Sequence, residues 1–450
     1  MERIELIQQV LALLKAEQWD ALERHLDEMA VQDIATAMAD MDVEDARRVL
    51  GLLPRDRRPR VFAYLSPALQ YALLMALPAE EGRYILYRLL PDDRTALLER
   101  LDAANLEALL KLLSPENVKE ALRLLGYPEK SAGRLMTPKA IAVRPGWTVG
   151  QALDYVREQS EAGETVNVVF VTDARGALLG RMRLRDFILG RAERGVEELM
   201  DPDPVTVLAS ESQEEAARLM KHYDLEVLPV VDPTGVLLGI VTVDDVIDVV
   251  EEEATEDFHK MASVGALNLS LREARPSLLY RKRVGWLVML VFMNIFGGAA
   301  IAHFEATIEA VIALVFFLPL IVDSGGNAGS QAATLMVRAL ATGDVRMKDW
   351  LRLWGKELGV ASALGVTMGV AVSFIGLWRG GPDVALVVAL AMVFVVIVGS
   401  MIGMLLPFIL ARFNMDPATA SAPLITSIAD ICGIMIYFSI ATAILSVPVG

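Results

Sequence analysis

The sequence predicts a multidomain membrane protein with an all-α superhelix, an α/β tandem repeat, a long acidic connecting helix and five transmembrane helices. Three observations predict this fold class. Residues 276–450 contain long apolar runs and only 10 Lys or Arg with 9 Asp or Glu, whereas residues 1–275 contain 32 and 49. A short proline motif recurs in the first 128 residues, and a longer segment is duplicated between residues 134 and 250. We therefore expect an acidic soluble part joined to a membrane part.

Composition argues against several classes of protein. The net charge of −17 in residues 1–275 argues against nucleic acid as a partner and is compatible with cations. The chain has one cysteine, Cys432, so we expect neither a disulfide framework nor a cysteine metal site. The first residues, MERIELIQQV, include early acidic residues and no apolar core of the kind found in signal peptides. We therefore expect no cleaved signal.

The first domain is predicted to be an all-α superhelix over residues 1–128. Its Leu/Ala/Ser-rich motifs end in a proline at Pro54, Pro67, Pro78, Pro91 and Pro115. Proline fits the first turn of a helix and ends the preceding one, so the spacing predicts stacked helices of about a dozen residues. An ordinary irregular helical bundle is the alternative.

The duplicated segment predicts two copies of an α/β domain. Residues 168–188 match residues 228–247, and the motifs LMTP and LMDP begin at Leu135 and Leu199. Each copy reads as strand, helix, strand, glycine turn, strand and helix. The repeat resembles a tandem pair of CBS (cystathionine-β-synthase) domains, which we place at residues 129–197 and 198–250. Such pairs are regulatory modules, and many bind adenine nucleotides.

That resemblance implies ATP as a regulator and a ribose contact for Asp186. The alternative is structural, because an Asp at the start of a helix often caps its own backbone.

An acidic run follows the second copy. Residues 244–257 hold eight carboxylates and no Lys or Arg, and Asp245, Asp248, Glu252 and Glu256 share one helix face. Like charges at this spacing destabilise a helix unless cations screen them, and hard divalent ions prefer oxygen ligands. We therefore predict that the acidic run is a divalent-ion sensor. We expect a connecting helix at 251–280 to join it to a membrane domain at 281–450. A solvated helix face is the alternative.

Five apolar runs have the length that a membrane crossing requires, about 20 residues. They cover residues 284–302, 310–337, 358–377, 384–411 and 417–447. Basic residues gather before the first run, between the second and third, and after the fourth. By the positive-inside rule those loops face the cytoplasm. We expect a multi-pass protein of the cell (inner) membrane, with the N-terminus in the cytoplasm and the C-terminus outside.

Two of the runs carry polar residues. The second contains PLIVDSGGNAGSQ (319–331). We expect its proline and paired glycines to break the helix at a place where the chain lines a water-filled path. The fifth carries Asp430, its only charge, with Ser427 and Thr426 three and four residues before it. An oxygen-only set with one carboxylate fits Mg²⁺, and no histidine lies within a run to suggest zinc or copper. Asp323 is left open as a second pore carboxylate or a helix-end residue.

Together these features resemble the MgtE family of Mg²⁺ channels over essentially the whole chain. The resemblance implies a homodimer in the lipid bilayer, with a pore between the two membrane domains that closes when internal Mg²⁺ is high. Its implied ion-pathway residues are Gly325, Gly326, Asn327, Gln331, Thr426, Ser427 and Asp430. Its implied cytosolic Mg²⁺ ligands are Asp92, Asp224, Asp245, Asp248, Glu253, Glu256 and Asp257. Arg60 and Ala96 stand where some relatives would carry acids, so we expect fewer ligands in the helical domain.

Two other functions are compatible with parts of the sequence. An ion-coupled secondary transporter of divalent cations such as Mg²⁺ and Co²⁺ would also use an intramembrane carboxylate. The five runs show no inverted repeat, which argues mildly against it. A membrane-embedded hydrolase would need a metal-binding His-Glu-x-x-His motif or two partnered aspartates in a protease-like motif, and the sequence has neither. We expect no enzyme.

Overall fold

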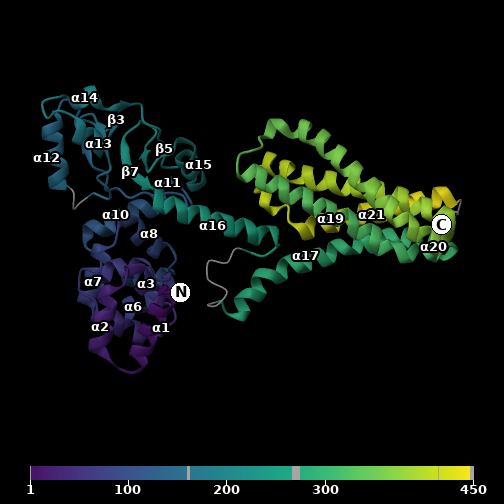
Figure 1. Cartoon of the computed structure of the whole chain (residues 1–450), viewed down its shortest axis with the longest axis horizontal. Coiled ribbons are helices and arrows are strands. Elements are labelled where there is room, and N and C mark those ends of the chain that lie inside the picture. Colours follow the sequence, from purple (N-terminus) through teal and green to yellow (C-terminus); the bar gives the residue numbers. More distant parts are fainter. Residues whose placement is uncertain (1, 160–162, 266–273, 414, 446–450) are drawn as a thin grey trace. The chain divides into compact units, whose positions relative to one another are not determined.

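The computed structural model describes residues 2–159, 163–265, 274–413 and 415–445. The chain divides into a first unit, residues 1–251, and a second unit, residues 252–450, and the boundary falls inside helix α16 (Figure 1).

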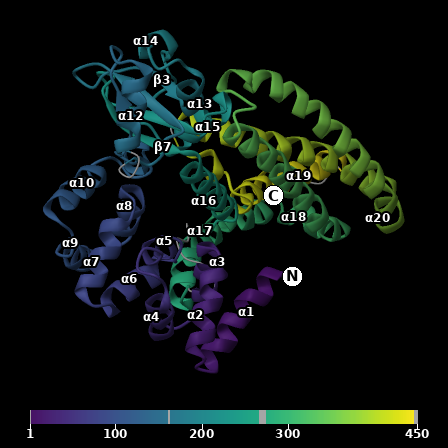
Figure 2. The same ribbon diagram turned by 60° about the vertical axis from the view of Figure 1, so that its left-hand side comes forward.

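The first ten helices are short and stacked. They are α1 (Glu2–Lys15), α2 (Trp19–Glu28), α3 (Val31–Met38), α4 (Val43–Leu52), α5 (Arg58–Ala63), α6 (Pro67–Ala76), α7 (Ala79–Arg88), α8 (Pro91–Glu99), α9 (Ala103–Leu110) and α10 (Pro115–Leu125). Alternate helices contact one another along the stack, as α3 does α5 and α6 does α8 (Figures 1 and 2). Three of the motif prolines begin α6, α8 and α10, as the proline spacing predicted.

The duplicated segment folds as two small sheets with helices. Its elements are α11 (Ala132–Leu135), β1 (Ala142–Val143), α12 (Val149–Gln159), β2 (Val168–Thr172), β3 (Leu178–Arg183), α13 (Leu184–Leu189), α14 (Val196–Leu199), β4 (Asp201–Pro202), β5 (Val207–Leu208), α15 (Gln213–Tyr223), β6 (Val227–Val231), β7 (Leu237–Thr242) and α16 (Val243–Met261). The strand orders are β1-β2-β3-β4 and β5-β6-β7. The outer strand of each sheet is parallel to its neighbour, whereas β2–β3 and β6–β7 are antiparallel.

Each copy contains the same kind of turn, and each contributes a segment that pairs with a strand of the other copy. In each hairpin an aspartate, Asp173 or Asp232, accepts backbone hydrogen bonds across the turn, and a glycine three residues later has positive φ. The segment after the second LM motif, β4, pairs with β3 of the first copy. Thr137, after the first LM motif, pairs with Ile240 of the second copy. The two copies are therefore built as one interlocked pair.

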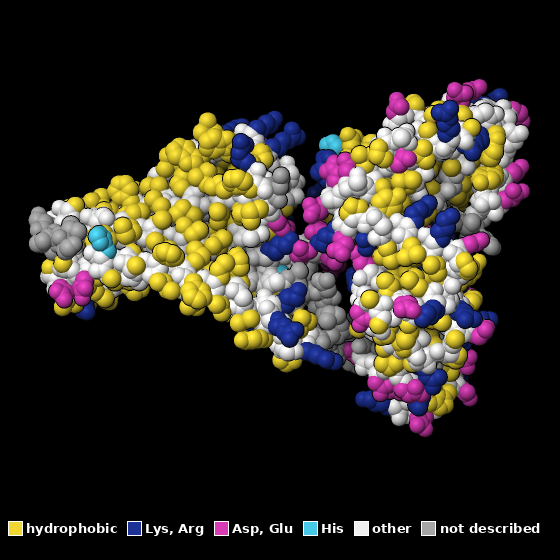
Figure 3. All heavy atoms as spheres, turned by 180° about the vertical axis from the view of Figure 1, so that it is seen from behind, with side chains coloured by type: hydrophobic (Ala, Val, Ile, Leu, Met, Phe, Trp, Pro, Cys, Tyr) yellow, Lys and Arg dark blue, Asp and Glu magenta, His cyan; other side chains and the backbone are white. Residues whose placement is uncertain are grey.

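The second unit consists mainly of long apolar helices. They are α17 (Pro276–His303), α18 (Glu305–Ala310), α19 (Ala313–Ala341), the 3₁₀ turn η1 (Met347–Asp349), α20 (Trp350–Arg412), the 3₁₀ turn η2 (Pro417–Thr419) and α21 (Ala422–Leu445). Four helices among the described residues are long and apolar enough to cross a membrane. Hydrophobic side chains gather over the visible surface of this unit (Figure 3). Val291, Phe292, Ile295 and Phe296 of α17 are exposed in the single chain.

The longest of these helices, α20, doubles back on itself. Its backbone leaves the helical conformation at Gly381, where φ is 81° and ψ is −176°. The two limbs then pack closely: a Cβ on Gly376 would lie 2.7 Å from the Cα of Ala385, and one on Gly365 would lie 2.9 Å from the Cα of Val393. These pairs run in opposite directions along the chain, so the limbs are antiparallel and the glycines permit their close approach.

Two sequence predictions about helices were wrong. The glycine motif does not break α19, which is continuous from Ala313 to Ala341. Its glycines are used for packing instead: Cβ atoms on Gly399 and Gly403 of α20 would overlap the carbonyl oxygens of Gly325 and Gly329. Because glycine has no side chain, the α19 and α20 backbones can come into contact, and this packing offsets the weak helix propensity of glycine.

The acidic connecting helix also differs from the prediction at 251–280. Helix α16 starts earlier, at Val243, and ends at Met261. Ser263 adopts a left-handed φ of 57°, and Val264 N–H donates to the carbonyl of His259 at 2.8 Å. This is a left-handed helix-ending motif, which stops the helix before α17. Residues 266–273 of the predicted helix lie outside the described residues.

Candidate functional site

A polar face lies between α19 and α21 in the second unit. Asp430 of α21 is half-buried, and one of its carboxylate oxygens lies 3.4 Å from the position a Cβ on Gly326 would occupy. The same position is 3.1 Å from the Thr426 side chain. Gly326 therefore lets α21 approach α19 where the carboxylate lies. We name Asp323, Asn327, Thr426 and Asp430 the membrane polar face.

The predicted ion-pathway residues other than Asp430 differ in exposure and in their contacts. Asn327 and Gln331 are exposed on α19 in the single chain, whereas Gly325 packs against Val395 of α20 and acts as a spacer. The hydroxyls of Thr426 and Ser427 donate to the carbonyl of Pro423, at 3.0 and 2.9 Å. These bonds use the hydroxyl protons and leave oxygen lone pairs as acceptors.

The sequence left the place of Asp323 open, and the structure puts it inside α19. It lies ten residues after the start of the helix, and its Oδ2 accepts a hydrogen bond of 2.9 Å from Nδ2 of Asn327. It stands one turn before Gly326, whose Cβ position lies 3.4 Å from an oxygen of Asp430, so both carboxylates belong to the same polar face. Asp323 is therefore not a helix-end residue.

A second group of carboxylates lies within the first unit. Its members, the acidic cluster, are Asp92, Asp93, Glu164, Asp244, Asp245 and Asp248. They come from the start of α8, the loop before β2 and the start of α16. Asp92 is buried, and its Oδ1 has no hydrogen-bond partner among the described residues; the same is true of Oε2 of Glu164. Buried oxygens without donors are costly and suit a cation.

Burial makes these carboxyls hold their protons unusually tightly. Burial, then the charge of Asp245, raises the pKa of Asp93 to about 6 and that of Glu164 to about 7. Burial likewise raises the pKa of Asp245 to about 6, although Thr242 donates a hydrogen bond of 2.8 Å to it. Burial, then Asp245, also raises the pKa of Asp92. Each carboxyl therefore disfavours ionisation of its neighbours.

The structure brings only some of the predicted cytosolic ligands together. Asp92, Asp245 and Asp248 belong to the acidic cluster, whereas Asp224 is exposed and ends α15 in a left-handed conformation. Among residues that the structure describes, no three His, Cys, Asp or Glu side chains are close enough to hold a metal ion directly. Sequence reasoning missed Glu164 and did not select Asp93.

The last turns of α16 form an ion-pair network within the second unit. Lys260 Nζ lies 2.6 Å from Oε1 of Glu256 and 2.5 Å from Oδ2 of Asp416, just before η2. Nearby, Oγ of Ser263 donates to Oγ of Ser421 at 2.8 Å. Burial, then the charge of Asp416, raises the pKa of Asp257. The acidic run contains no Lys or Arg, but Glu256 still has a basic partner, because Lys260 lies one turn further along α16.

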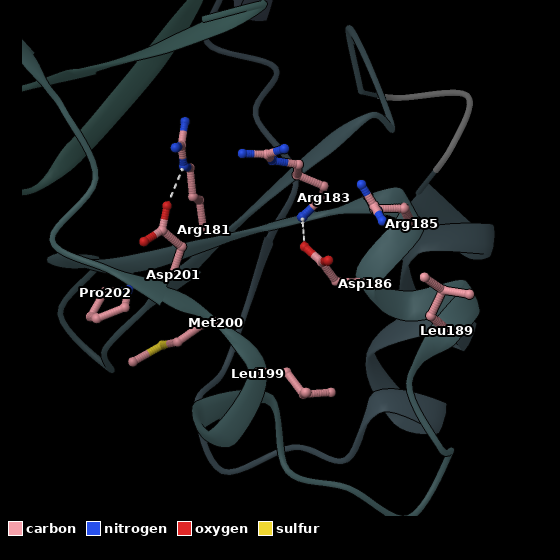
Figure 4. A pocket seen from close by; sticks show the side chains of 9 residues that line it. All are labelled: Arg181, Arg183, Arg185, Asp186, Leu189, Leu199, Met200, Asp201 and Pro202. Carbon is pink, nitrogen blue, oxygen red and sulfur yellow. Dashed lines mark hydrogen bonds and ion pairs between the residues drawn. The ribbon is translucent and has the colours of Figure 1, made fainter. Parts of the chain in front are cut away.

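A cavity of about 440 Å³ lies beside the first sheet of the repeat (Figure 4). Arg181, Arg183, Arg185 and Asp186 line its polar side, and Nε of Arg181 donates to Asp201 at 3.0 Å. Asp186 accepts a hydrogen bond of 2.9 Å from the backbone N–H of Arg183, so it caps α13 as the structural alternative held. The cavity is basic and can accept an anionic group.

Comparisons with known proteins cover almost the whole chain. Family models match residues 318–440 (a divalent cation transporter, MgtE), 29–130 (the MgtE intracellular N domain) and 196–252 (a CBS domain). The magnesium transporter MgtE of Thermus thermophilus is 41% identical over 428 residues, covering 94% of this chain and 95% of that protein. The magnesium transporter MgtE of Bacillus subtilis is 33% identical over 440 residues, covering 98% and 97%.

A solved structure resembles the soluble part. The crystal structure of the cytosolic domain of the Mg²⁺ channel MgtE in complex with ATP shares 40% identity, with a TM-score of 0.51. It covers 53% of this chain, and 99% of that chain is matched.

Proposed function

Because the chain belongs to the MgtE family of magnesium transporters, we propose that it is a Mg²⁺-selective channel for magnesium uptake, closed by intracellular Mg²⁺. The family is one of transporters and not of enzymes. The observation that carries the proposal is Asp430, a carboxylate held on the membrane polar face against the glycine motif of α19. An ionisable group inside a membrane helix is costly and generally marks an ion path.

The chemistry of this face favours a hydrated divalent ion. Its groups are carboxylates, an amide and hydroxyls, which are oxygen ligands. Mg²⁺ sheds water reluctantly and is usually held through one or two carboxylates with several waters retained. We propose that Asp430, Asn327, Gln331, Thr426 and Ser427 line the path.

We propose five membrane crossings, with the two limbs of α20 counted separately. The antiparallel packing of the limbs around Gly381 supports this count. By the positive-inside rule, the basic loops support a cytoplasmic N-terminus and a C-terminus outside the cell membrane. We further propose a homodimer whose paired polar faces form the pore. Light scattering in detergent that gave the mass of a single chain would contradict the dimer.

Gating is proposed to act through α16. Its first turn carries Asp245 of the acidic cluster, and its last turn is held by Lys260 to Asp416 and by Ser263 to Ser421. Asp416 and Ser421 precede α21, the helix that carries Asp430. Mg²⁺ bound to the acidic cluster would stabilise one position of α16 and close the pore. A ligand shifts such an equilibrium only through higher affinity for one state.

The remaining proposed regulatory ligands, Glu253, Glu256 and Asp257, lie on the same helix and would bind Mg²⁺ near its membrane end. Asp224 is retained as a proposed ligand from its match to the family pattern.

ATP is proposed as a second regulator in the basic cavity. Guanidinium groups bind phosphate through paired hydrogen bonds, and Arg185 lies beside Asp186 on the cavity wall (Figure 4). Arg185→Ala should weaken ATP binding by about tenfold in calorimetry, since a charge-assisted bond contributes roughly 1.5–3 kcal/mol. Unchanged ATP affinity in this variant, with Arg175→Ala as the control at the exposed hairpin turn, would place the phosphates elsewhere.

Uptake by the purified chain in proteoliposomes tests the central proposal. We expect Mg²⁺ entry that follows the Mg²⁺ gradient and falls as Mg²⁺ on the cytoplasmic side rises. Entry that requires a proton gradient would instead support the ion-coupled secondary transporter. Entry that is insensitive to cytoplasmic Mg²⁺ would remove the gating proposal and leave transport standing.

A further inference from the structure

The stripe of α19 that faces Asp430 carries a second carboxylate. Asp323, Gly326, Asn327 and Ser330 are spaced i, i+3, i+4 and i+7, so they lie along one side of the helix. A Cβ added to Gly326 would lie 3.4 Å from Oδ1 of Asp430, which fixes the side of α19 toward α21. Asp323 is one turn before Gly326 on this side of the helix.

No basic side chain on either helix is placed to neutralise this pair. Helix α21 contains no Lys, Arg or His, and α19 contains only Arg338, in its last turn. Arg338 is fifteen residues beyond Asp323, which is about 22 Å along a helix. Asp323 lies one turn before Gly326, the position at which α19 meets the carboxylate of Asp430. Two neighbouring carboxylates with no fixed countercharge require a mobile cation or a proton.

The orientation of Asp323 is set by its neighbour. Asn327 donates a hydrogen bond to Oδ2 of Asp323, and both side chains are exposed in the single chain. Further along the stripe, Oγ of Ser330 is enclosed and has no hydrogen-bond partner among the described residues. An enclosed hydroxyl without a protein partner suits a bound water, of the kind a hydrated ion carries.

We propose that Asp323 is a second ion-pathway carboxylate that determines selectivity for divalent over monovalent cations, with Asn327 as its positioning residue. This inference rests on the proposed function. With both aspartates ionised, each chain presents two negative charges to the path. A divalent ion gains about twice the Coulomb energy of a monovalent ion from the same pair. Asp323 thereby raises affinity for Mg²⁺ and disfavours Na⁺ or K⁺.

The test is Asp323→Asn in proteoliposomes, because asparagine keeps the size of the side chain and an oxygen for Asn327. We expect the apparent affinity for Mg²⁺ to fall about tenfold, with Na⁺ becoming an effective competitor. Asn327→Ala should shift both quantities in the same direction by less. Asp383→Asn, at an exposed carboxylate beside the α20 reversal, is the matched control and should leave both unchanged.

The outcomes separate this inference from the proposed function. Transport by the native chain with unchanged Mg²⁺ affinity and Na⁺ exclusion in Asp323→Asn would overturn the role of Asp323 alone. Absence of Mg²⁺ transport by the native chain would overturn the proposed function. Native elution of each variant on size exclusion verifies folding, and if Asp323→Asn elutes abnormally, Asp323→Glu provides the second test. Asp323→Glu should retain Na⁺ exclusion because it retains the charge, and its loss there would also contradict the inference.

Discussion

Replacing Asp430 with alanine is expected to abolish Mg²⁺ uptake in proteoliposomes while leaving the folded chain intact. Asp430 is the only charge in residues 417–447, and it sits where α21 contacts Gly326. In the paired arrangement its removal takes one carboxylate from each side of the pore. Asp323 would remain, but the path would lose the half-buried carboxylate at the contact between α19 and α21, where we propose that the hydrated Mg²⁺ is held.

We expect the loss of Mg²⁺ uptake to be large, because a charge that is costly to place in the membrane indicates a functional role for Asp430. A carboxylate at the centre of a membrane helix costs roughly 2.5–3.5 kcal/mol on insertion scales. Its removal should therefore stabilise the membrane unit or leave it unchanged, so lost uptake could not be ascribed to misfolding. Asp344→Ala, an exposed carboxylate between α19 and η1, is the control and should transport normally. Normal uptake by Asp430→Ala would remove this residue from the pore.

Much of the architecture could be predicted because its signals are local. Proline at Pro67, Pro91 and Pro115 starts a helix through its fixed φ, and the effect needs no distant partner. The two hairpins are also local, since Asp173 and Asp232 organise turns of four residues. Hydropathy predicts membrane helices for a similar reason, because the length of an apolar run is a property of the sequence alone.

The errors arose where a distant partner decides the outcome. The glycine motif predicts a break in α19, because glycine is a weak helix former. Whether glycine breaks a helix, however, depends on what packs against it. Here the backbone of α20 at Gly399 and Gly403 packs directly against the glycines of α19, and the helix stays continuous. The pairing of Lys260 with Asp416 joins residues 156 positions apart, and neither residue carries a motif. Glu164 likewise stands alone in a loop, and only the fold brings it to Asp245.

The stability of the first unit is expected to fall as pH rises from about 5 to about 8, and Mg²⁺ is expected to reverse the loss. In the folded chain burial raises the pKa of Asp93 and Asp245 to about 6 and that of Glu164 to about 7. In the unfolded chain the same groups ionise near their ordinary values of about 4. The folded form therefore binds more protons between these limits, so stability decreases as pH rises through that window.

Divalent ions act on the ionised form, so their effect has the opposite pH dependence. Near pH 8 the carboxylates of the acidic cluster repel, and a bridging Mg²⁺ removes that repulsion. Near pH 5 most of these carboxyls hold protons, which compete with the ion. Thermal unfolding of a soluble fragment 1–261 measures both: with chelator we expect the midpoint to drop by about 5 °C or more across the window. Mg²⁺ should restore the midpoint near pH 8 and change it little near pH 5.

Variants of the cluster distinguish this account from general charge effects. Glu164→Gln combined with Asp93→Asn removes two raised-pKa groups, so the pH slope should flatten and Mg²⁺ should stabilise less. Glu193→Gln, at an exposed site, changes charge without touching the cluster and should behave like the native fragment. In the full chain, Mg²⁺ should slow proteolysis of the first unit in the native protein more than in the cluster variant. Burial and repulsion at these carboxyls are what should couple protons and Mg²⁺ to folding. The acidic cluster would therefore not be the sensor if Mg²⁺ slowed proteolysis equally in both proteins. The same conclusion would follow if the double substitution left the pH dependence of the unfolding midpoint unchanged.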